Sequence, residues 1–473
     1  MFARDLRDWI RQVDELGELR TVDGATWQED IGMATDLLTR KEGTPAVVFD
    51  NIPGYPQGYR VMVNSFGSLR RIALTLGLPI DAGPQELIGL WRRKLAGLKP
   101  IPPVYVSDGP VMENVQEGDD VDAFSFPTPQ WHEQDGGRYI GTGSCDITRD
   151  PDEGWVNLGV YRVMIHDAKR LGFYISPGKH GRIHREKYFS RGELCPVVVA
   201  VGLDPMLYLA TATEVPYGVC EYDWAGGIKG EPVRVIKGKH TGLPIPADAE
   251  IVLEGFASPQ DRLLEGPFGE WTGYYASASR EEPVIDIKAI YYRNDPIIFS
   301  SPPNKPPDDQ ARYRAFMRSA LMREDIEKAG VPDIAGVWCH PVGGSRLLLA
   351  VSITQRYPGH ARQAGHVAAM CHSGAYLGRY VVVVDEDIDV TDLNEVVWAM
   401  CTRADPAGAI DIINRAWSGP LDPAIHPDGK GFNSRAIIDA CRPFEWKDKF
   451  PPVNEPSPEV KRKALEKWGH LTK

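Results

Sequence analysis

The 473-residue sequence predicts a multidomain protein of mixed α/β and α+β class, with a β-rich unit between two helix-containing α/β units. Three observations support this prediction. The chain is too long for a single hydrophobic core. Helical and strand periodicities alternate over residues 1–110 and again over residues 306–473, whereas short β-branched runs and Gly-, Pro- and Asp-rich turns dominate residues 111–305. We therefore expect three domains with these boundaries.

The N-terminal unit is expected to alternate helices with strands. Apolar residues recur at helical spacing between Asp5 and Leu19. Further helices are expected at residues 30–40, 68–76 and 84–98, and strands at 46–49 and 59–64. The proline-rich segment 100–103 is expected to be a linker.

The central unit is expected to be an antiparallel barrel or sandwich. Its predicted strands span residues 141–148, 156–165, 196–201, 233–237, 250–254 and 284–292. Alternation along strand 156–165 would place Asn157 and Tyr161 on one face and Arg162 on the other. An arginine within an apolar run needs an anion, and a structural carboxylate would serve as well as a substrate.

Helices return after Pro306. The sequence predicts helices at 308–329, 393–403 and 459–471, and buried strands at 347–354 and 380–385. These elements fit a C-terminal α/β domain.

The composition excludes several classes of protein. A formal net charge of −12 and the lack of a basic block argue against nucleic acid or an anionic membrane as partner. No apolar run approaches the ~20 residues needed to span a bilayer, and residues 1–8 lack the apolar core of a signal peptide. Seven cysteines without a CxxC pair argue against a disulfide framework and structural zinc. We expect a cytoplasmic protein.

Two glutamates, Glu265 and Glu270, flank a Gly-Pro-Phe-Gly stretch. Glycine and proline stop a helix, so this segment is expected to be a loop or a bent strand. Such a backbone can aim both acids at one point while Phe268 and Trp271 form a dry wall, and apolar surroundings raise the pKa of a carboxyl group. A hairpin corner with two solvent-facing glutamates explains the spacing equally well.

Other polar residues give weaker signals. Lys179-His180 is flanked by glycines and could approach a phosphate, although most such pairs lie in surface turns. Asn157, His180 and Glu221 are plausible ligands for Mn²⁺ or Mg²⁺, but their spacing does not join them. The stretches 132–139 and 301–308 could be functional, but they are interpreted first as a turn and an interdomain connector.

Together these segments resemble the UbiD family of decarboxylases, which use prenylated FMN. The resemblance covers nearly the whole chain and is carried, in the family's order and spacing, by segments 157–162, 179–180, 221–227, 265–270 and 384–390. It implies a central split β-barrel that binds the flavin, and a C-terminal domain through which the chain forms homodimers or homohexamers. In detail the chain looks closest to the branch that acts on aromatic or heteroaromatic acids, such as hydroxybenzoates.

The resemblance also implies roles for individual residues. Asn157, His180 and Glu221 match the family's Mn²⁺ ligands, with the metal bridging to the flavin phosphate and a K⁺ nearby. Further residues expected at the cofactor are Leu158, Val160, Tyr161, Arg162, Lys179, Thr213 and Arg435. Arg435 stands where relatives commonly carry a phosphate-binding lysine, which keeps the charge but changes the geometry.

Arg162, Glu265 and Glu270 match the family's Glu–Arg–Glu catalytic network. The implied reaction is a reversible, non-oxidative decarboxylation through a covalent adduct with prenylated FMN, in which Glu270 donates the proton. Arg162 would position the carboxylate of the substrate, and Glu265 would hold Arg162. The cofactor would come from a flavin prenyltransferase. Hydroxybenzoates, protocatechuate, indole-, pyrrole- or furan-type acids and larger fused rings all fit this chemistry.

Two other functions stay open from the residues. An FMN-dependent oxidoreductase on a split barrel would need a nicotinamide site, and no GxGxxG follows a predicted strand, although split-barrel reductases do without one. A non-catalytic accessory subunit that binds flavin would have no need for the trio of Arg162, Glu265 and Glu270. Release of CO₂ from an aryl acid without NAD(P)H would separate these functions.

Overall fold

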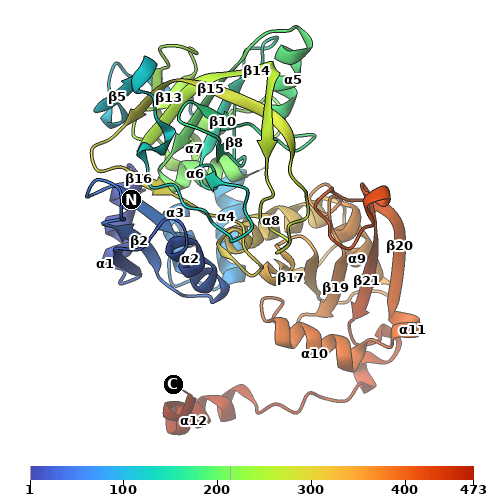
Figure 1. Ribbon diagram of the computed structural model, residues 1–473. Helices are drawn as coiled ribbons and strands as arrows, with labels where there is room; N and C mark the ends of the chain where they lie inside the picture. The colour runs from blue at the N-terminus through green and yellow to red at the C-terminus, as the bar shows by residue number, and fades with distance from the viewer. Residues whose placement is uncertain (1, 214, 473) are drawn as a thin grey trace.

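The N-terminal unit is the first of three domains in the computed structural model, which describes residues 2–213 and 215–472 (Figure 1). Its elements are α1 (Leu6–Glu15), β1 (Leu19–Asp23), α2 (Asp30–Arg40), β2 (Ala46–Asp50), β3 (Arg60–Val63), α3 (Leu69–Leu76) and α4 (Pro84–Ala96). The first helix ends earlier than predicted. Gly17, with φ 73°, turns the chain after it, so Leu19 begins a strand.

The N-terminal sheet is completed by a strand from far along the chain. Its order is β1-β2-β3-β16, and β16 (Ile297–Phe299) runs parallel to β3 with Ile297 opposite Arg60. Residues 297–299, which the sequence assigned to the central unit, therefore belong to the N-terminal sheet.

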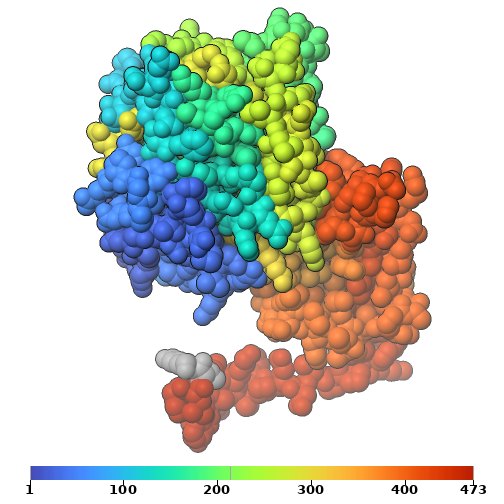
Figure 2. Space-filling model, viewed as in Figure 1, coloured from blue at the N-terminus to red at the C-terminus, as the bar shows by residue number. Residues whose placement is uncertain are grey.

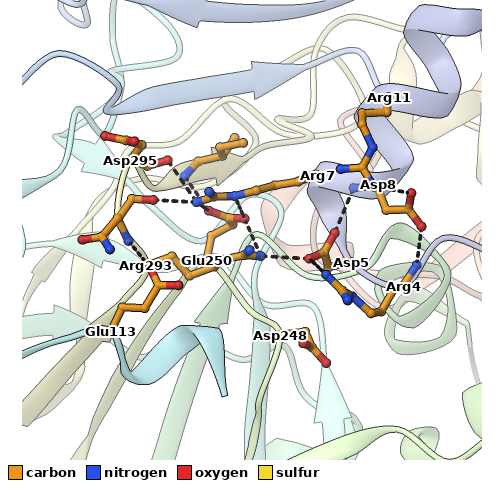
Figure 3. A network of polar contacts seen from close by, with 12 residues as sticks. Arg4, Asp5, Arg7, Asp8, Arg11, Glu113, Asp248, Glu250, Arg293 and Asp295 are labelled. Atoms are coloured by element: carbon orange, nitrogen blue, oxygen red, sulfur yellow. Dashed lines mark hydrogen bonds and ion pairs between the residues drawn. The ribbon is translucent and has the colours of Figure 1, made fainter. Parts of the chain in front are cut away.

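An ion network fastens helix α1 to the central domain (Figure 3). Glu250 is fully buried, and its carboxylate accepts hydrogen bonds from Nε and Nη2 of Arg7 at 2.8 and 2.7 Å. Nη1 of Arg293 donates to Glu250 at 3.2 Å and to Asp5 at 3.1 Å. The beginning of the chain is thus tied to the start of the long strand β14.

The central domain is built around a curled antiparallel sheet, as the sequence predicted. The sheet order is β6-β9-β10-β15-β14-β11-β7-β8, and β5 pairs with β15. The strands are β5 (Asn114–Glu117), β6 (Arg138–Tyr139), β7 (Cys145–Arg149), β8 (Val156–Gly159), β9 (Met164–Ile165), β10 (Arg170–Gly172), β11 (Cys195–Val201), β14 (Ile251–Glu265) and β15 (Arg280–Tyr292), while β4 (Val104–Tyr105), β12 (Arg234–Lys237) and β13 (Pro244–Pro246) form a separate small sheet.

The long hairpin β14–β15 gives this sheet its curl. Its register shifts twice, between Glu254 and Gly255 and between Ala257 and Arg262, and such irregularities bend a strand and increase its twist. The result is the half-barrel that the predicted split barrel requires. The loop between the two strands reaches the C-terminal domain (Figure 1), where a Cβ on Gly344 would lie 2.5 Å from the ring of Trp271.

Three helices of the central domain were not predicted: α5 (His180–Ser190), α6 (Pro205–Ala212) and α7 (Glu221–Lys229). Helix α6 is buried on nearly every side, so its sequence carries no polar face to reveal a helical period. Its start does carry a local signal, because the carboxylate of Asp204 accepts from Met206 N at 3.1 Å and Pro205 occupies the first turn.

The C-terminal domain is a five-stranded sheet with the order β17-β18-β19-β21-β20, in which β18, β19 and β21 are parallel. Its elements are α8 (Asp309–Lys328), β17 (Ile334–Cys339), β18 (Leu348–Ile353), α9 (His360–Met370), β19 (Tyr380–Asp385), α10 (Leu393–Arg403), α11 (Pro406–Ala409), β20 (Ile410–Trp417), β21 (Phe432–Ala440) and α12 (Pro458–Trp468). Helix α8 is anchored in the N-terminal domain, because Asp309 accepts from Phe66 N at 2.6 Å. In the described part of the chain, no helix is long and apolar enough to cross a membrane.

Candidate active site

Arg162 lies between the two glutamates of the Gly-Pro-Phe-Gly segment. Its Nη2 donates to Oε2 of Glu265 at 2.8 Å, and its Nη1 donates to Oε1 of Glu270. Glu265 is the last residue of β14, and Glu270 lies in the loop that follows. The structure therefore brings these three residues together, and it excludes the hairpin corner with two solvent-facing glutamates.

The prediction of one strand over residues 156–165 was wrong, because the pairing breaks after Gly159 and Arg162 stands in the loop between β8 and β9. Buried Asp146 stabilises this break by accepting from Tyr161 N at 3.1 Å. The amide of Tyr161, which could otherwise pair with a neighbouring strand, is bound by this side chain. The strand therefore ends before Arg162, whose side chain turns towards β14.

The two glutamates are buried and Arg162 is partly buried between them. Glu265 is 1% exposed and Glu270 is 7% exposed. Burial raises the pKa of Glu270, and this effect outweighs the opposing attraction of Arg162. Burial alone would lower the pKa of Arg162, but Glu270 and Glu265 together raise it. The cluster thus pairs a permanent cation with a carboxyl group whose pKa is raised by burial.

Aromatic side chains enclose this cluster, and sequence reasoning missed two of them, Tyr139 and Tyr174. Tyr139 donates its hydroxyl to Oε1 of Glu265 at 3.1 Å. The guanidinium carbon of Arg162 lies 4.3 Å from the ring centroid of Tyr174 and 5.4 Å from that of Phe268. Phe268 was predicted as part of a dry wall and is 2% exposed. Nothing in the sequence distinguished Tyr139 or Tyr174 from other buried tyrosines.

A second cluster forms around the hydroxyl of Tyr161. That oxygen accepts from Nδ2 of Asn157 at 3.3 Å and from Gly181 N, next to His180, at 3.1 Å. Leu158 N donates to the carboxylate of Glu221 at 2.7 Å. These bonds link the neighbourhoods of Asn157, His180 and Glu221, which are far apart in the sequence.

The side chains of this second cluster suit a cation. Glu221 is 3% exposed, and burial raises its pKa to about 8. The ring of His180 lies edge-on to Trp155 and Tyr217, with centroids 5.4 and 5.6 Å away. Among the described residues, no three His, Cys, Asp or Glu side chains gather into a metal site by themselves. An amide oxygen from Asn157, an imidazole and a carboxylate would together make a donor set for Mn²⁺.

The remaining residues predicted at the cofactor fall into two groups. Lys179 immediately precedes α5, Thr213 follows α6, and Val160 lies in the β8–β9 loop, all within the central domain. Arg435 instead stands on β21, 1% exposed, and its guanidinium donates to the backbone oxygens of Ala369, Gly374, Ala375 and Trp417. The structure therefore does not bring Arg435 to the second cluster, and its role at the flavin stays a prediction.

Comparison with known proteins places this geometry in a family. The chain matches models of 3-octaprenyl-4-hydroxybenzoate carboxy-lyase: the N-terminal domain over residues 10–91, the Rift-related domain over 104–306 and the C-terminal domain over 313–440. It is 32% identical to the pyrrole-2-carboxylic acid decarboxylase of Pseudomonas aeruginosa over 463 residues, which cover 94% of this chain and 92% of that protein.

Solved structures agree along the whole chain. The open form of vanillic acid decarboxylase from Sedimentibacter hydroxybenzoicus superposes with a TM-score of 0.86 at 29% identity, covering 100% of both chains. An evolved dimeric form of the UbiD-class enzyme HmfF from Pelotomaculum thermopropionicum, in complex with prFMN, gives a TM-score of 0.82 at 26% identity and covers 97% of this chain and 98% of that one. The chain is thus a member of the UbiD family of carboxy-lyases, with the complete set of the family's three domains.

Proposed function

We propose that the chain catalyses the reversible, non-oxidative decarboxylation of an aromatic or heteroaromatic carboxylic acid with prenylated FMN, and that Glu270 is the proton donor. The observation that carries the proposal is the buried cluster in which Arg162 binds Glu265 and Glu270. The names of the relatives, which include decarboxylases of pyrrole-2-carboxylic acid and vanillic acid, support the substrate class.

The chain's own residues divide the chemistry between them. Arg162 would bind the carboxylate of the substrate, and Glu265, held by Tyr139, would keep the guanidinium in place. Loss of CO₂ leaves a carbanion-like carbon, for which prenylated FMN would supply an electron sink. Glu270 would then protonate that carbon, because its burial favours the acid form from which a proton can be given.

The cluster around Tyr161 would hold the cofactor. Asn157, His180 and Glu221 would bind Mn²⁺, and Leu158, Val160, Tyr161, Lys179 and Thr213 would line the flavin and its phosphate. The buried Glu221 carboxylate supports this assignment, since a divalent cation would offset the cost of ionising it. We also propose that a K⁺ ion binds nearby, and we assign no residues as its ligands.

The decisive experiment is co-expression with a flavin prenyltransferase, followed by the mass and absorbance spectrum of the released cofactor. A panel of acids such as vanillate, protocatechuate and pyrrole-2-carboxylate is then assayed for CO₂ without NAD(P)H. Prenylated FMN with stoichiometric CO₂ is the expected result. Turnover that requires NAD(P)H would favour the oxidoreductase, and loaded protein without turnover on any acid would favour the accessory subunit.

We also propose that the chain is a homo-oligomer, as a dimer or a hexamer. Helix α12 stands away from the C-terminal domain (Figures 1 and 2), and residues 451–468 are all exposed, including Val460, Leu465 and Trp468. Four basic and two acidic residues on this helix complement a chain whose net charge is −12. Truncation after residue 456 should lower the molar mass in solution, and an unchanged mass would count against α12 as an oligomer contact.

A further inference from the structure

The turn at residues 132–136 is packed against the loop that carries Glu270. Gly136 N donates to Pro267 O at 2.8 Å, and Gln134 N donates to the hydroxyl of Tyr275 at 3.1 Å. A Cβ on Gly136 would lie 2.1 Å from the oxygen of Gly266, so any side chain at residue 136 would clash with the loop. The turn therefore also supports the loop that carries Glu270.

Asp135 makes the central contact between turn and loop. Its buried carboxylate accepts from Gly269 N, the amide next to Glu270, at 2.9 Å. Its other oxygen accepts from His132 N at 3.1 Å and faces the His132 ring nitrogen Nδ1 at 3.0 Å. A hydrogen bond to a charged acceptor is about twice as strong as one between neutral groups, so this carboxylate fixes the backbone immediately before Glu270.

His132 extends the contact to the neighbouring domains. Its Nε2 faces Oδ1 of Asn304 at 2.9 Å, and Nδ2 of Asn304 donates to Oγ1 of Thr39 at 3.2 Å, which sets the orientation of the amide. Both ring nitrogens thus face oxygen acceptors, an arrangement that the protonated ring satisfies. Asn304 N donates to Asp308, the N-cap of α8, at 2.7 Å. Asp135 and His132 together form a clamp on the loop that carries Glu270. Through Asn304, this clamp is anchored in the N-terminal domain and at the start of α8.

We propose that Asp135 and His132 are positioning residues, which act through the amide of Gly269 to hold the carboxyl group of Glu270 against Arg162. The inference rests on the proposed function. It explains why the two stretches interpreted from the sequence as a turn and a connector meet beside the site. Because a displacement of about 1 Å at a reacting group can cost about 100-fold in rate, a clamp on this backbone has a direct kinetic consequence.

The test compares Asp135→Ala with Asp135→Asn. The alanine removes the acceptors for Gly269 N and His132 N, whereas the asparagine keeps one oxygen for Gly269 N and places an amide NH2 where Oδ2 accepts from His132 N. Asp392→Ala is the matched control, since Asp392 accepts from Asn394 N at 2.8 Å in the C-terminal domain. Two quantities are measured in the prenylated-FMN-loaded protein: kcat and KM for the best acid of the panel, and hydrogen–deuterium exchange of the peptide covering residues 266–275.

We expect Asp135→Ala to lower kcat about 10- to 100-fold with KM nearly unchanged, and to speed exchange in residues 266–275 without speeding it elsewhere. Asp135→Asn, which keeps the acceptor for Gly269 N but not the one for His132 N, should recover part of both, and Asp392→Ala should change neither. If Asp135→Ala does not fold, His132→Gln should show the same pattern at smaller size.

The two readouts separate failure of this inference from failure of the proposed function. Exchange that stays at the wild-type rate in Asp135→Ala would overturn the clamp whether or not the protein is a decarboxylase. Faster exchange with an unchanged kcat would overturn its positioning role while leaving the decarboxylase intact. If the wild type releases no CO₂ from any acid, the proposed function fails and the positioning role fails with it, while the exchange data still decide whether the clamp exists.

Discussion

Glu250 and Glu270 are both buried glutamates bound by arginine, yet their surroundings differ. The carboxylate of Glu250 accepts four hydrogen bonds, two from Arg7 and one each from Arg293 and Ile297 N. Within the described chain, the only side-chain hydrogen bond to Glu270 comes from Arg162, and burial raises the pKa of its carboxyl group.

The difference separates a carboxylate whose oxygens are engaged by the fold from one that keeps an acceptor position for a ligand. A buried carboxylate that already accepts four hydrogen bonds from its own fold has no acceptor position left for a ligand. A buried carboxyl group with few donors around it keeps an acceptor position available to a ligand. A glutamate–arginine pair therefore stabilises the fold beside α1 and, in our proposal, takes part in catalysis beside β14.

Replacing Glu270 should have the largest effect, and this effect should be on turnover. We expect Glu270→Gln to lower turnover by about 10² to 10⁴, because it removes the acid while keeping the shape. Glu270→Asp should retain part of the activity. The measurement is CO₂ release by protein whose flavin absorbance matches that of the wild type, and full activity of the glutamine variant would exclude Glu270 as the proton donor.

Replacing Glu250 should instead act on folding. Glu250→Ala leaves Arg7 and Arg293 without their shared partner, and we expect it to lower the free energy of unfolding by about 3 to 5 kcal/mol, read from urea titration. Turnover per folded molecule should be unchanged. Glu117→Ala, which removes an exposed partner of Lys239 at 2.8 Å, is the control and should matter little. Equal stability of the two variants would refute the structural role of Glu250.

A third buried glutamate, Glu221, should make metal affinity depend on pH. Glu221 must lose its proton to bind Mn²⁺, and its pKa in the metal-free protein is raised to about 8 by burial. Affinity should therefore rise about tenfold per pH unit below pH 8 and level off above it. Calorimetric titration of metal-free protein with Mn²⁺ between pH 6 and 8 measures this slope. The Glu221→Gln variant should lose the dependence that comes from this carboxylate, and an identical slope in the variant would remove Glu221 from the site.

The smallest effect is expected at Tyr139. Tyr139→Phe removes one hydrogen bond from Glu265, worth about 0.5 to 1.5 kcal/mol, and should slow turnover about 3- to 10-fold. Tyr208→Phe removes a buried hydroxyl contact with Tyr313 at 3.2 Å and serves as the control. A decrease of equal size in both variants would mean that the effect of Tyr139 passes through general stability.

Much of the fold follows from local sequence. Helices such as α2 and α10 carry an amphipathic period, and β19 is a continuous apolar run, so each was predicted to within a residue or two. Helix α6 was missed because burial on nearly every side erases the polar face on which helical periodicity depends. Strand β16 was not predicted, and its place in the N-terminal sheet is a long-range pairing that no local pattern encodes.

For the site, the sequence alone determined which residue types could do the chemistry, since Glu265, Glu270 and Arg162 stand in segments where glycine, proline or apolar neighbours make a charge unusual. Only the tertiary structure decided that they meet, because 103 residues separate Arg162 from Glu265 and the contact needs the break after Gly159. It also decided that burial raises the pKa of the Glu270 carboxyl group. Burial and the number of donors around a carboxylate are properties of the packed chain, and a sequence of residues does not contain them.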